Sequence, residues 1–123
     1  MYEITVRGNF SSAHNLREYR GKCEAIHGHN WKVEVYLMGK ELNRDGMLLD
    51  FRILKDILNR VLNRFDHQFL NELPEFKDRP PSTENLAHLI FKRLKEGLHF
   101  EKIRVSKVSV WESEDSCAIY QED

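Results

Sequence analysis

The segment CEAIHGHNW, residues 23–31, carries side chains that could bind a metal ion. His27 and His29 open an alternating apolar run, and in an extended chain their side chains point the same way, roughly 6.6 Å apart. His14 ends an earlier alternating run, so pairing of the two runs can bring it opposite them. Three neutral imidazoles suit zinc and leave one position open for water or substrate. The alternative is a metal-free strand, because an H-x-H pair is more often incidental.

Cys23 lies four residues before His27. A nearby cation lowers the pKa of a thiol, and the resulting thiolate can act as a base or a nucleophile. The alternative is a small buried hydrophobic residue. With Cys117 it makes only two cysteines, too few to form a disulfide framework.

Two further positions carry groups for proton transfer or hydrogen bonding. Asp66 and His67 follow a predicted helix. His67 could act as a general acid/base with the Asp66 carboxylate beside it. The alternative is that a cationic His67 stabilises the end of the helix. Glu112 has the same parity as Val108 and Val110, so we expect it to face inward, where a carboxylate needs a partner. The alternative is a solvent-facing residue near a turn.

Four strands and two helices must position these residues. Alternation predicts strands from Tyr2 to His14, from Trp31 to Gly39, from 103 to 110 with a bulge midway, and from 117 to 120. Asp50 can cap a helix over 51–65, whose apolar spacing is Phe51, Leu54, Leu58, Val61 and Phe65. Ser82 or Thr83 can cap a second helix that ends near Gly97. The order ββααββ predicts one α+β domain, residues 1–123, with both helices on one face of an antiparallel sheet.

The other face of that sheet raises a difficulty. Trp31, Trp111 and several valines are too apolar for a surface in contact with water. We therefore expect the chain to form an oligomer.

Composition excludes several partners. The formal net charge is -1 with both signs interspersed, which gives no electrostatic case for binding nucleic acid or an anionic membrane. The apolar runs are far short of the ~20 residues of a membrane span. Glu3 and Arg7 interrupt the first ten residues, so we expect no signal peptide there and a cytoplasmic protein.

Six blocks together resemble a known family. They are, in order, FSSAHNL, CEAIHGHN, DGMLLDFRILK, FDHQFLN, PPSTENLA and VWES. Their sequence and spacing resemble the 6-pyruvoyltetrahydropterin synthase family, and the length is most similar to its bacterial 6-carboxy-5,6,7,8-tetrahydropterin synthases of queuosine biosynthesis. The resemblance covers about residues 3 to 120.

The resemblance implies the tunnelling fold, in which three subunits close their sheets into a barrel and two rings stack into a homohexamer (a dimer of trimers). It implies active sites between subunits, so that Cys23 and the Asp66–His67 pair meet from different chains. It also implies a Zn²⁺ cofactor and a small-molecule pterin substrate. The implied site residues are the zinc ligands His14, His27 and His29, the catalytic residues Cys23, Asp66 and His67, and the substrate-binding residues Ser82, Thr83, Glu84 and Glu112. Ser82 replaces the family's usual threonine.

The implied reaction converts 7,8-dihydroneopterin triphosphate to 6-carboxytetrahydropterin, with loss of acetaldehyde and triphosphate. Several alternatives stay open. Pyruvoyltetrahydropterin formation is one. Cleavage of dihydroneopterin to 6-hydroxymethyl-7,8-dihydropterin for folate synthesis is another, because Glu24 beside Cys23 resembles a group with both activities, in which it is the possible second base. Two non-enzymatic alternatives are a zinc- or pterin-binding protein and a structural zinc site.

Overall fold

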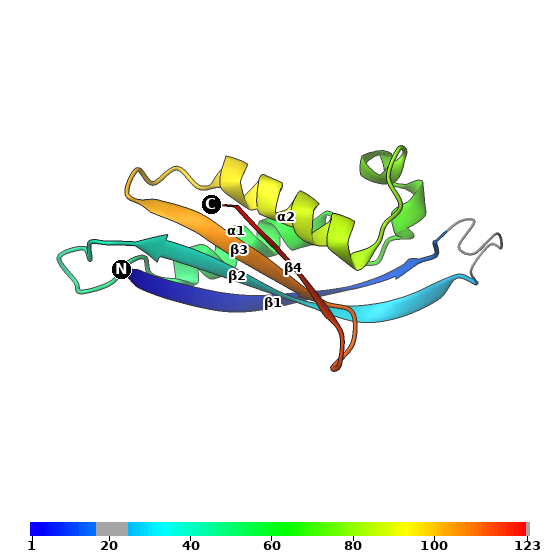
Figure 1. The fold of residues 1–123 in the computed structure, drawn as a ribbon, viewed down its shortest axis with the longest axis horizontal. Helices are drawn as coiled ribbons and strands as arrows, with labels where there is room; N and C mark the ends of the chain where they lie inside the picture. The colour runs from blue at the N-terminus through cyan, green and yellow to red at the C-terminus, as the bar shows by residue number, and fades with distance from the viewer. Residues whose placement is uncertain (17–24, 123) are drawn as a thin grey trace.

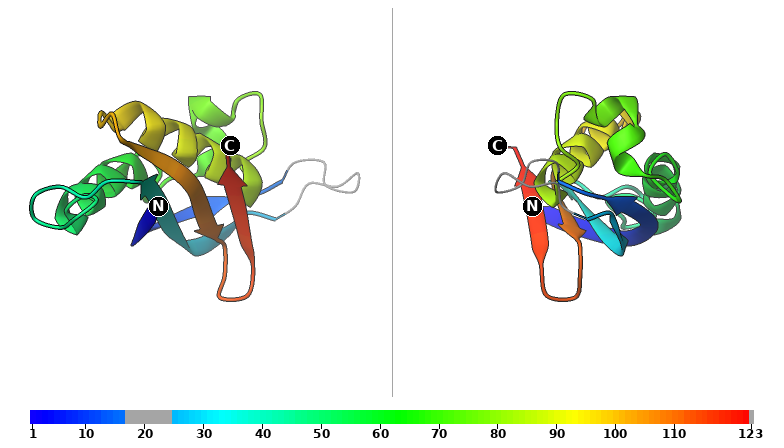
Figure 2. Two further views of the ribbon diagram at one scale, coloured as in Figure 1. Left: turned by 60° about the vertical axis from the view of Figure 1, so that its left-hand side comes forward. Right: turned by 90° about the vertical axis from the view of Figure 1, so that its right-hand side faces the viewer.

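The computed structural model of the chain describes residues 1–16 and 25–122. One antiparallel sheet has the order β1-β2-β3-β4, and two helices cover one of its faces (Figures 1 and 2). The elements are β1 (Tyr2–His14), β2 (His27–Gly39), α1 (Phe51–Asn63), η1 (Leu70–Glu72), η2 (Pro74–Phe76), α2 (Thr83–Gly97), β3 (Ile103–Trp111) and β4 (Cys117–Gln121). The predicted ββααββ order and α+β class are confirmed. None of the helices in the described ranges is long and apolar enough to cross a membrane.

The pairing of β1 with β2 explains how the histidines come together. Phe10 pairs with Trp31, Ser12 with His29, and His14 with His27. Because side chains alternate between the faces of a strand, all of these residues share the face that the helices cover. The expected hairpin-like pairing of the two strands is confirmed, and it places His14 directly opposite His27.

The predicted bulge in the third strand is present. Tyr36 of β2 pairs with Lys107, whereas the next residue, Leu37, pairs with Val105, so Ser106 is the extra residue on β3. Its hydroxyl donates to the Tyr36 carbonyl at 3.1 Å. The bulge keeps Val105 on the same face as Val108, which is why the inward parity changes between them.

Both predicted helix caps form. Asp50 accepts a hydrogen bond from the Arg52 amide at 2.9 Å, and Ser82 accepts one from the Asn85 amide at 3.1 Å. The first helix ends at Asn63, two residues before the predicted end.

Phe51 begins the apolar spacing that predicts α1, but it does not lie on the packed face of the helix. Leu54 and Leu58 are fully buried there, whereas Phe51 is 58% exposed. Phe51 lines a groove beside Val6 and Arg7 of β1, so the first turn of the helix lies over the edge of the sheet and not over its centre.

Of the residues given as the reason for oligomerisation, Trp111 lies on the open face of the sheet, whereas Trp31 and the valines do not. Trp31 is fully buried, and the valines of β2 and β3 are buried with it under the helices. The opposite face is mixed. It carries Trp111, which is half-buried, and Ile119, which is 57% exposed. On the same face Glu34 accepts hydrogen bonds from Arg7 Nε at 2.9 Å and from Trp111 Nε1 at 2.7 Å. Among the described residues, the outer edge of β4 has no strand partner, and neither has β1 beyond the bridge from Ala13 to Phe69.

Truncation of the first helix's central side chain tests this packing. Leu58→Ala is expected to lower the free energy of unfolding by about 2–5 kcal/mol, because Leu58 is fully buried against the sheet. Ile53→Ala on the same helix is the control, since Ile53 is 46% exposed, and it should change stability by about 0.5 kcal/mol or less. Urea unfolding measures both. Equal losses would contradict the assigned face of α1.

Candidate metal centre and active site

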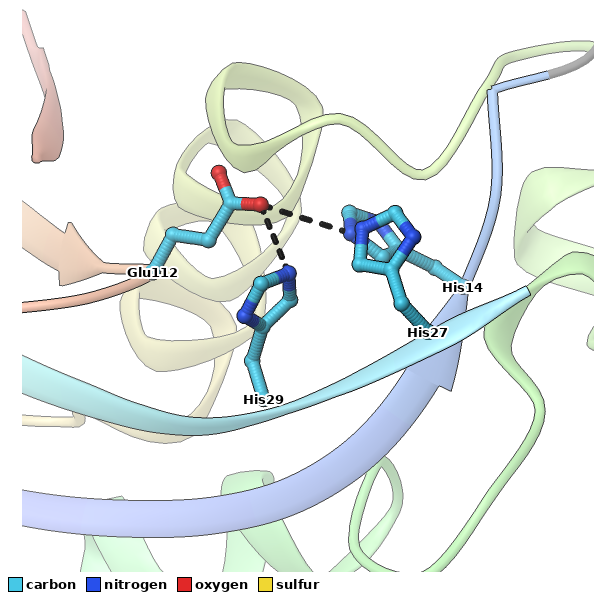
Figure 3. A group of neighbouring side chains, drawn as sticks. All are labelled: His14, His27, His29 and Glu112. Carbon is cyan, nitrogen blue, oxygen red and sulfur yellow. Dashed lines mark ion pairs between the residues drawn. The ribbon is translucent and has the colours of Figure 1, made fainter. Parts of the chain in front are cut away.

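Three histidines and one glutamate meet at the end of the sheet (Figure 3). His14 comes from the end of β1, His27 and His29 from the start of β2, and Glu112 from the residue after β3. One possible ligand atom from each lies within 4.8 Å of all the others. The three imidazoles and the carboxylate could therefore hold one metal ion.

Backbone carbonyls orient two of the imidazoles. His14 Nδ1 lies 2.7 Å from the Pro81 carbonyl oxygen, and His27 Nδ1 lies 2.9 Å from that of Ala25. A carbonyl can only accept, so each Nδ1 carries the proton and donates it. This leaves Nε2 of both rings with a lone pair, as a metal requires. Sequence reasoning missed the Pro81 contact, because it joins residues 67 positions apart.

The donor set fits zinc. His14 is 3% exposed, and its buried Nε2 makes no hydrogen bond to any described residue. Leaving such an atom unsatisfied is costly, and a metal ion would satisfy it. Zinc binds imidazole nitrogen and carboxylate oxygen at ~2.0–2.2 Å in a tetrahedron, which puts ligand atoms roughly 3.3–3.5 Å apart. A shift of about an ångström would bring the atoms of this cluster to such separations.

An aromatic layer lies beneath the imidazoles. The Trp31 ring is fully buried, with its centroid 5.0 Å from that of His14 and 5.1 Å from that of His29. It stacks on Phe10 at 5.8 Å. These large rings fix the base of the site, since neither has room to move in a packed core.

Glu112 is shared between the histidines and the start of α2. Its Oε1 lies 2.8 Å from His29 Nε2 and 3.5 Å from His14 Nε2. Its Oε2 accepts a hydrogen bond from Thr83 Oγ1 at 3.0 Å. Parity predicts that Glu112 faces inward, but not that it joins the histidines. The reason lies in the register of the sheet: Trp111 pairs with Lys32, which sets Glu112 beside the strand segment that follows His29.

Asp66 and His67 lie along the outer edge of β1. Asp66 Oδ1 accepts from the Ser11 amide at 2.9 Å, while its Oδ2 lies 2.9 Å from His67 Nδ1. The Ser11 amide, followed by the His67 contact, holds the pKa of Asp66 below its usual range, so the carboxylate stays ionised. His67 adopts φ 55°, an uncommon conformation for a residue other than glycine, and its amide donates to the Ser11 carbonyl at 2.7 Å.

These two residues are not part of the histidine cluster within the described chain. The side chain of His67 is 83% exposed, so its imidazole faces outward from the subunit. The alternative of a histidine that stabilises a helix end does not fit, because α1 ends at Asn63.

The remaining predicted site residues fall into two groups. Cys23 and Glu24 lie outside the described residues. At the start of α2, Ser82 uses its hydroxyl as the helix cap, the buried Thr83 contacts Glu112, and Glu84 is exposed.

Comparison with known proteins identifies the family of the chain. Residues 3–123 match the sequence model of the family described as 6-pyruvoyl tetrahydropterin synthase. A protein of Archaeoglobus fulgidus, provisionally named a 6-carboxy-5,6,7,8-tetrahydropterin synthase, is 42% identical over 105 residues, covering 85% of this chain and 86% of its own. The dihydroneopterin monophosphate aldolase of Pyrococcus furiosus is 30% identical over 112 residues, covering 91% of this chain and 90% of its own.

A solved structure shares the fold over nearly its full length. The 6-pyruvoyl tetrahydropterin synthase of Caenorhabditis elegans superposes with a TM-score of 0.87 at 27% identity, covering 99% of this chain and 96% of that one. The matches to the family model, to the relatives and to the solved structure each extend over most of the sequence. The chain therefore belongs to the 6-pyruvoyl tetrahydropterin synthase family.

Proposed function

We propose that the chain is a zinc-dependent 6-carboxy-5,6,7,8-tetrahydropterin synthase acting on 7,8-dihydroneopterin triphosphate, in the route to queuosine. The observation that carries the proposal is the convergence of His14, His27 and His29, with a buried, unsatisfied Nε2 on His14. The name of the Archaeoglobus fulgidus relative supports the choice of product.

Each group has a separate role. Zinc bound by the three histidines would act as a Lewis acid that favours negative charge on the hydroxyl oxygens of the substrate side chain. Glu112 accepts hydrogen bonds from the amino group and ring N–H of the pterin, since its two oxygens match that edge. Thr83 keeps one of these oxygens in place through its hydroxyl.

Proton transfer falls to Cys23 and His67. The Cys23 thiolate takes or returns a proton at the substrate side-chain carbon, and His67 handles the partner proton. Asp66 stays ionised beside His67 Nδ1 and thus fixes the proton there, which leaves Nε2 as the group that exchanges protons with substrate.

Oligomerisation completes the site in this proposal. The outward-facing His67 can reach the histidine cluster of a neighbouring subunit, in a homohexamer formed from two trimeric rings. The open strand edges at β1 and β4 offer the means of joining one sheet to the next.

A second candidate function has a specific observation behind it. The Pyrococcus furiosus relative is named an aldolase, and Glu24 lies beside Cys23 in this sequence. With Glu24 as a second base, the same site would cleave the side chain of dihydroneopterin to release 6-hydroxymethyl-7,8-dihydropterin.

Product analysis tests the proposal. Zinc-loaded protein is incubated with dihydroneopterin triphosphate and, separately, with dihydroneopterin, and products are identified by chromatography and mass. The expected result is 6-carboxytetrahydropterin from the triphosphate alone. A pyruvoyl product would make the enzyme a 6-pyruvoyltetrahydropterin synthase, and a hydroxymethyl product from dihydroneopterin would favour the second function. If neither compound is consumed while zinc binds, a zinc- or pterin-binding protein remains.

A further inference from the structure

We infer that Asn71 is a positioning residue, whose side chain fastens the segment that carries Asp66 and His67 to the end of β1. The inference rests on the proposed function, in which His67 serves the metal centre of a neighbouring subunit. Asn71 lies in η1, and its side chain contacts the backbone of the residue that follows β1. Its role would be to hold the acid/base pair in place, and not to touch the substrate.

The carboxamide of Asn71 makes two hydrogen bonds with the backbone of one residue. Its Oδ1 accepts from the Asn15 amide at 3.0 Å, and its Nδ2 donates to the Asn15 carbonyl at 2.8 Å. Two hydrogen bonds exchanged with one residue are also what neighbouring strands of an antiparallel sheet make. Asn71 therefore holds the residue that follows β1 in the way that a neighbouring strand would.

The segment before η1 runs along β1 through contacts between backbone atoms. The His67 amide donates to the Ser11 carbonyl at 2.7 Å, and the Ala13 amide donates to the Gln68 carbonyl at 3.0 Å. Ala13 also forms a parallel bridge with Phe69. The hydrogen bonds of Asn71 continue this row of contacts at its far end, and a substitution can remove them because a side chain makes them.

His67 depends on this attachment. Its φ of 55° lies in the left-handed region, which a residue other than glycine adopts only where the surrounding contacts hold it there. Its side chain is 83% exposed, so packing within its own subunit does not set the direction of the imidazole. The direction must then come from the backbone, and thus from the attachment of the segment to β1.

The metal side of the same contact has other supports. Asn15 directly follows His14, so Asn71 could instead hold that metal ligand in place. His14, however, is 3% exposed, donates from Nδ1 to the Pro81 carbonyl at 2.7 Å and is paired with His27 in the sheet. Loss of the Asn71 side chain should therefore disturb the acid/base pair more than the metal ligand.

Two variants and a control test the inference. Asn71→Ala removes both hydrogen bonds, whereas Asn71→Asp keeps the oxygen that accepts from the Asn15 amide. Asn43→Ala is the control, because Asn43 Oδ1 also accepts from two amides, those of Asp45 at 2.9 Å and Met47 at 3.1 Å. Asn43 lies in the connection that follows β2, and this end of the paired strands is opposite to the histidines.

The expected result is a kcat lowered by about 10- to 100-fold in Asn71→Ala, since a displacement of about 1 Å can cost 100-fold in rate. KM and the zinc content should stay as in the wild type, because His67 moves a proton and binds neither zinc nor the pterin ring. Asn71→Asp should recover part of the lost rate. Asn43→Ala should lower the melting temperature about as much as Asn71→Ala does, with kcat unchanged.

Hydrogen exchange read by mass spectrometry follows the attachment without turnover. Peptides that cover residues 65–71 should exchange faster in Asn71→Ala than in the wild type, because the segment opens more often. Peptides that cover His27 and His29 should exchange as in the wild type. Equal exchange of residues 65–71 in both proteins would mean that Asn71 does not hold the segment.

Mixed oligomers show which metal centre the substitution affects. Assembled with Cys23→Ala, Asn71→Ala should regain roughly a quarter of the wild-type activity, because some sites then combine its Cys23 with the other chain's well-held His67. Assembled with His67→Ala it should regain none, since every remaining His67 belongs to an Asn71→Ala chain. A mixture of Cys23→Ala with His67→Ala is the positive control for shared sites.

Three outcomes would overturn the inference. One is an unchanged kcat in Asn71→Ala, and another is an equal loss of kcat in Asn43→Ala. The third is the reverse pattern of recovery, with His67→Ala and not with Cys23→Ala, which would make Asn71 a support of its own subunit's metal centre. Failure of the proposed function is distinguishable, because the wild type would then consume neither pterin compound, while hydrogen exchange would still test the attachment.

Discussion

Replacing His27 by alanine is expected to abolish the proposed zinc binding and with it the proposed synthase activity. The substitution takes away one of the three imidazoles, and it also breaks the contact that fixes His27 Nδ1 on the Ala25 carbonyl. Loss of a partner outside the ligands costs 10–100-fold in metal affinity, so loss of a ligand itself should cost at least about 100-fold. Turnover should fall with zinc occupancy.

The stability of the folded chain provides the measurement. A ligand that binds only the folded state stabilises it by RT ln(1 + [L]/Kd), which is about 2.7 kcal/mol at a zinc concentration of 100 times Kd. Wild type should gain this amount when zinc is added to chelator-stripped protein, and His27→Ala should gain essentially none. Without zinc, the two proteins should unfold alike, because His27 lies half-buried at the first position of β2.

His99→Ala is the matched control, since His99 is an exposed histidine beyond α2 and outside the cluster. It should retain one zinc per chain and the full stabilisation. If His27→Ala also kept its zinc and the same gain in stability, the histidine cluster would not be the metal site.

The parts of the site that could be predicted from the sequence are those that depend on the regular alternation of side chains along a strand or on contacts between near neighbours in the chain. Alternation along the first two strands places His14, His27 and His29 on one face, and this arrangement follows once the strands pair. The same reasoning correctly predicts the caps at Asp50 and Ser82, because each cap involves a side chain and an amide only two or three residues away.

The parts that could not be predicted depend on long-range register. Glu112 reaches the histidines because β3 pairs with β2 in one register, and the extra residue at Ser106 shifts that register within the strand. A one-residue difference would turn Glu112 to the opposite face. The Pro81 carbonyl reaches His14 only because α2 packs over the sheet. Exposure of Phe51 likewise follows from where α1 begins relative to the sheet edge, which a helical period does not specify.

Cys23→Ala and His67→Ala should each lose turnover by about 10²–10⁴-fold, the range of a single acid–base group, while the zinc content stays at one per chain. His67→Ala should not change stability appreciably, because the side chain of His67 is 83% exposed and packs against little of its own subunit.

Mixing the two inactive variants tests whether the active site is shared between subunits. If Cys23 and His67 of one site come from different chains, random assembly of equal amounts gives both intact residues to about a quarter of the sites, since each is drawn independently. Refolding or co-expressing the variants together should thus recover roughly a quarter of the wild-type activity.

The alternative gives a different result. If both residues serve a site within one chain, every chain in the mixture lacks one of them, and no activity returns. Two affinity tags, one on each variant, isolate the mixed oligomers, so a failure to recover activity cannot be attributed to a failure to mix. Recovery in the doubly tagged fraction would identify the exposed face of His67 as the part of each subunit that completes its neighbour's metal centre.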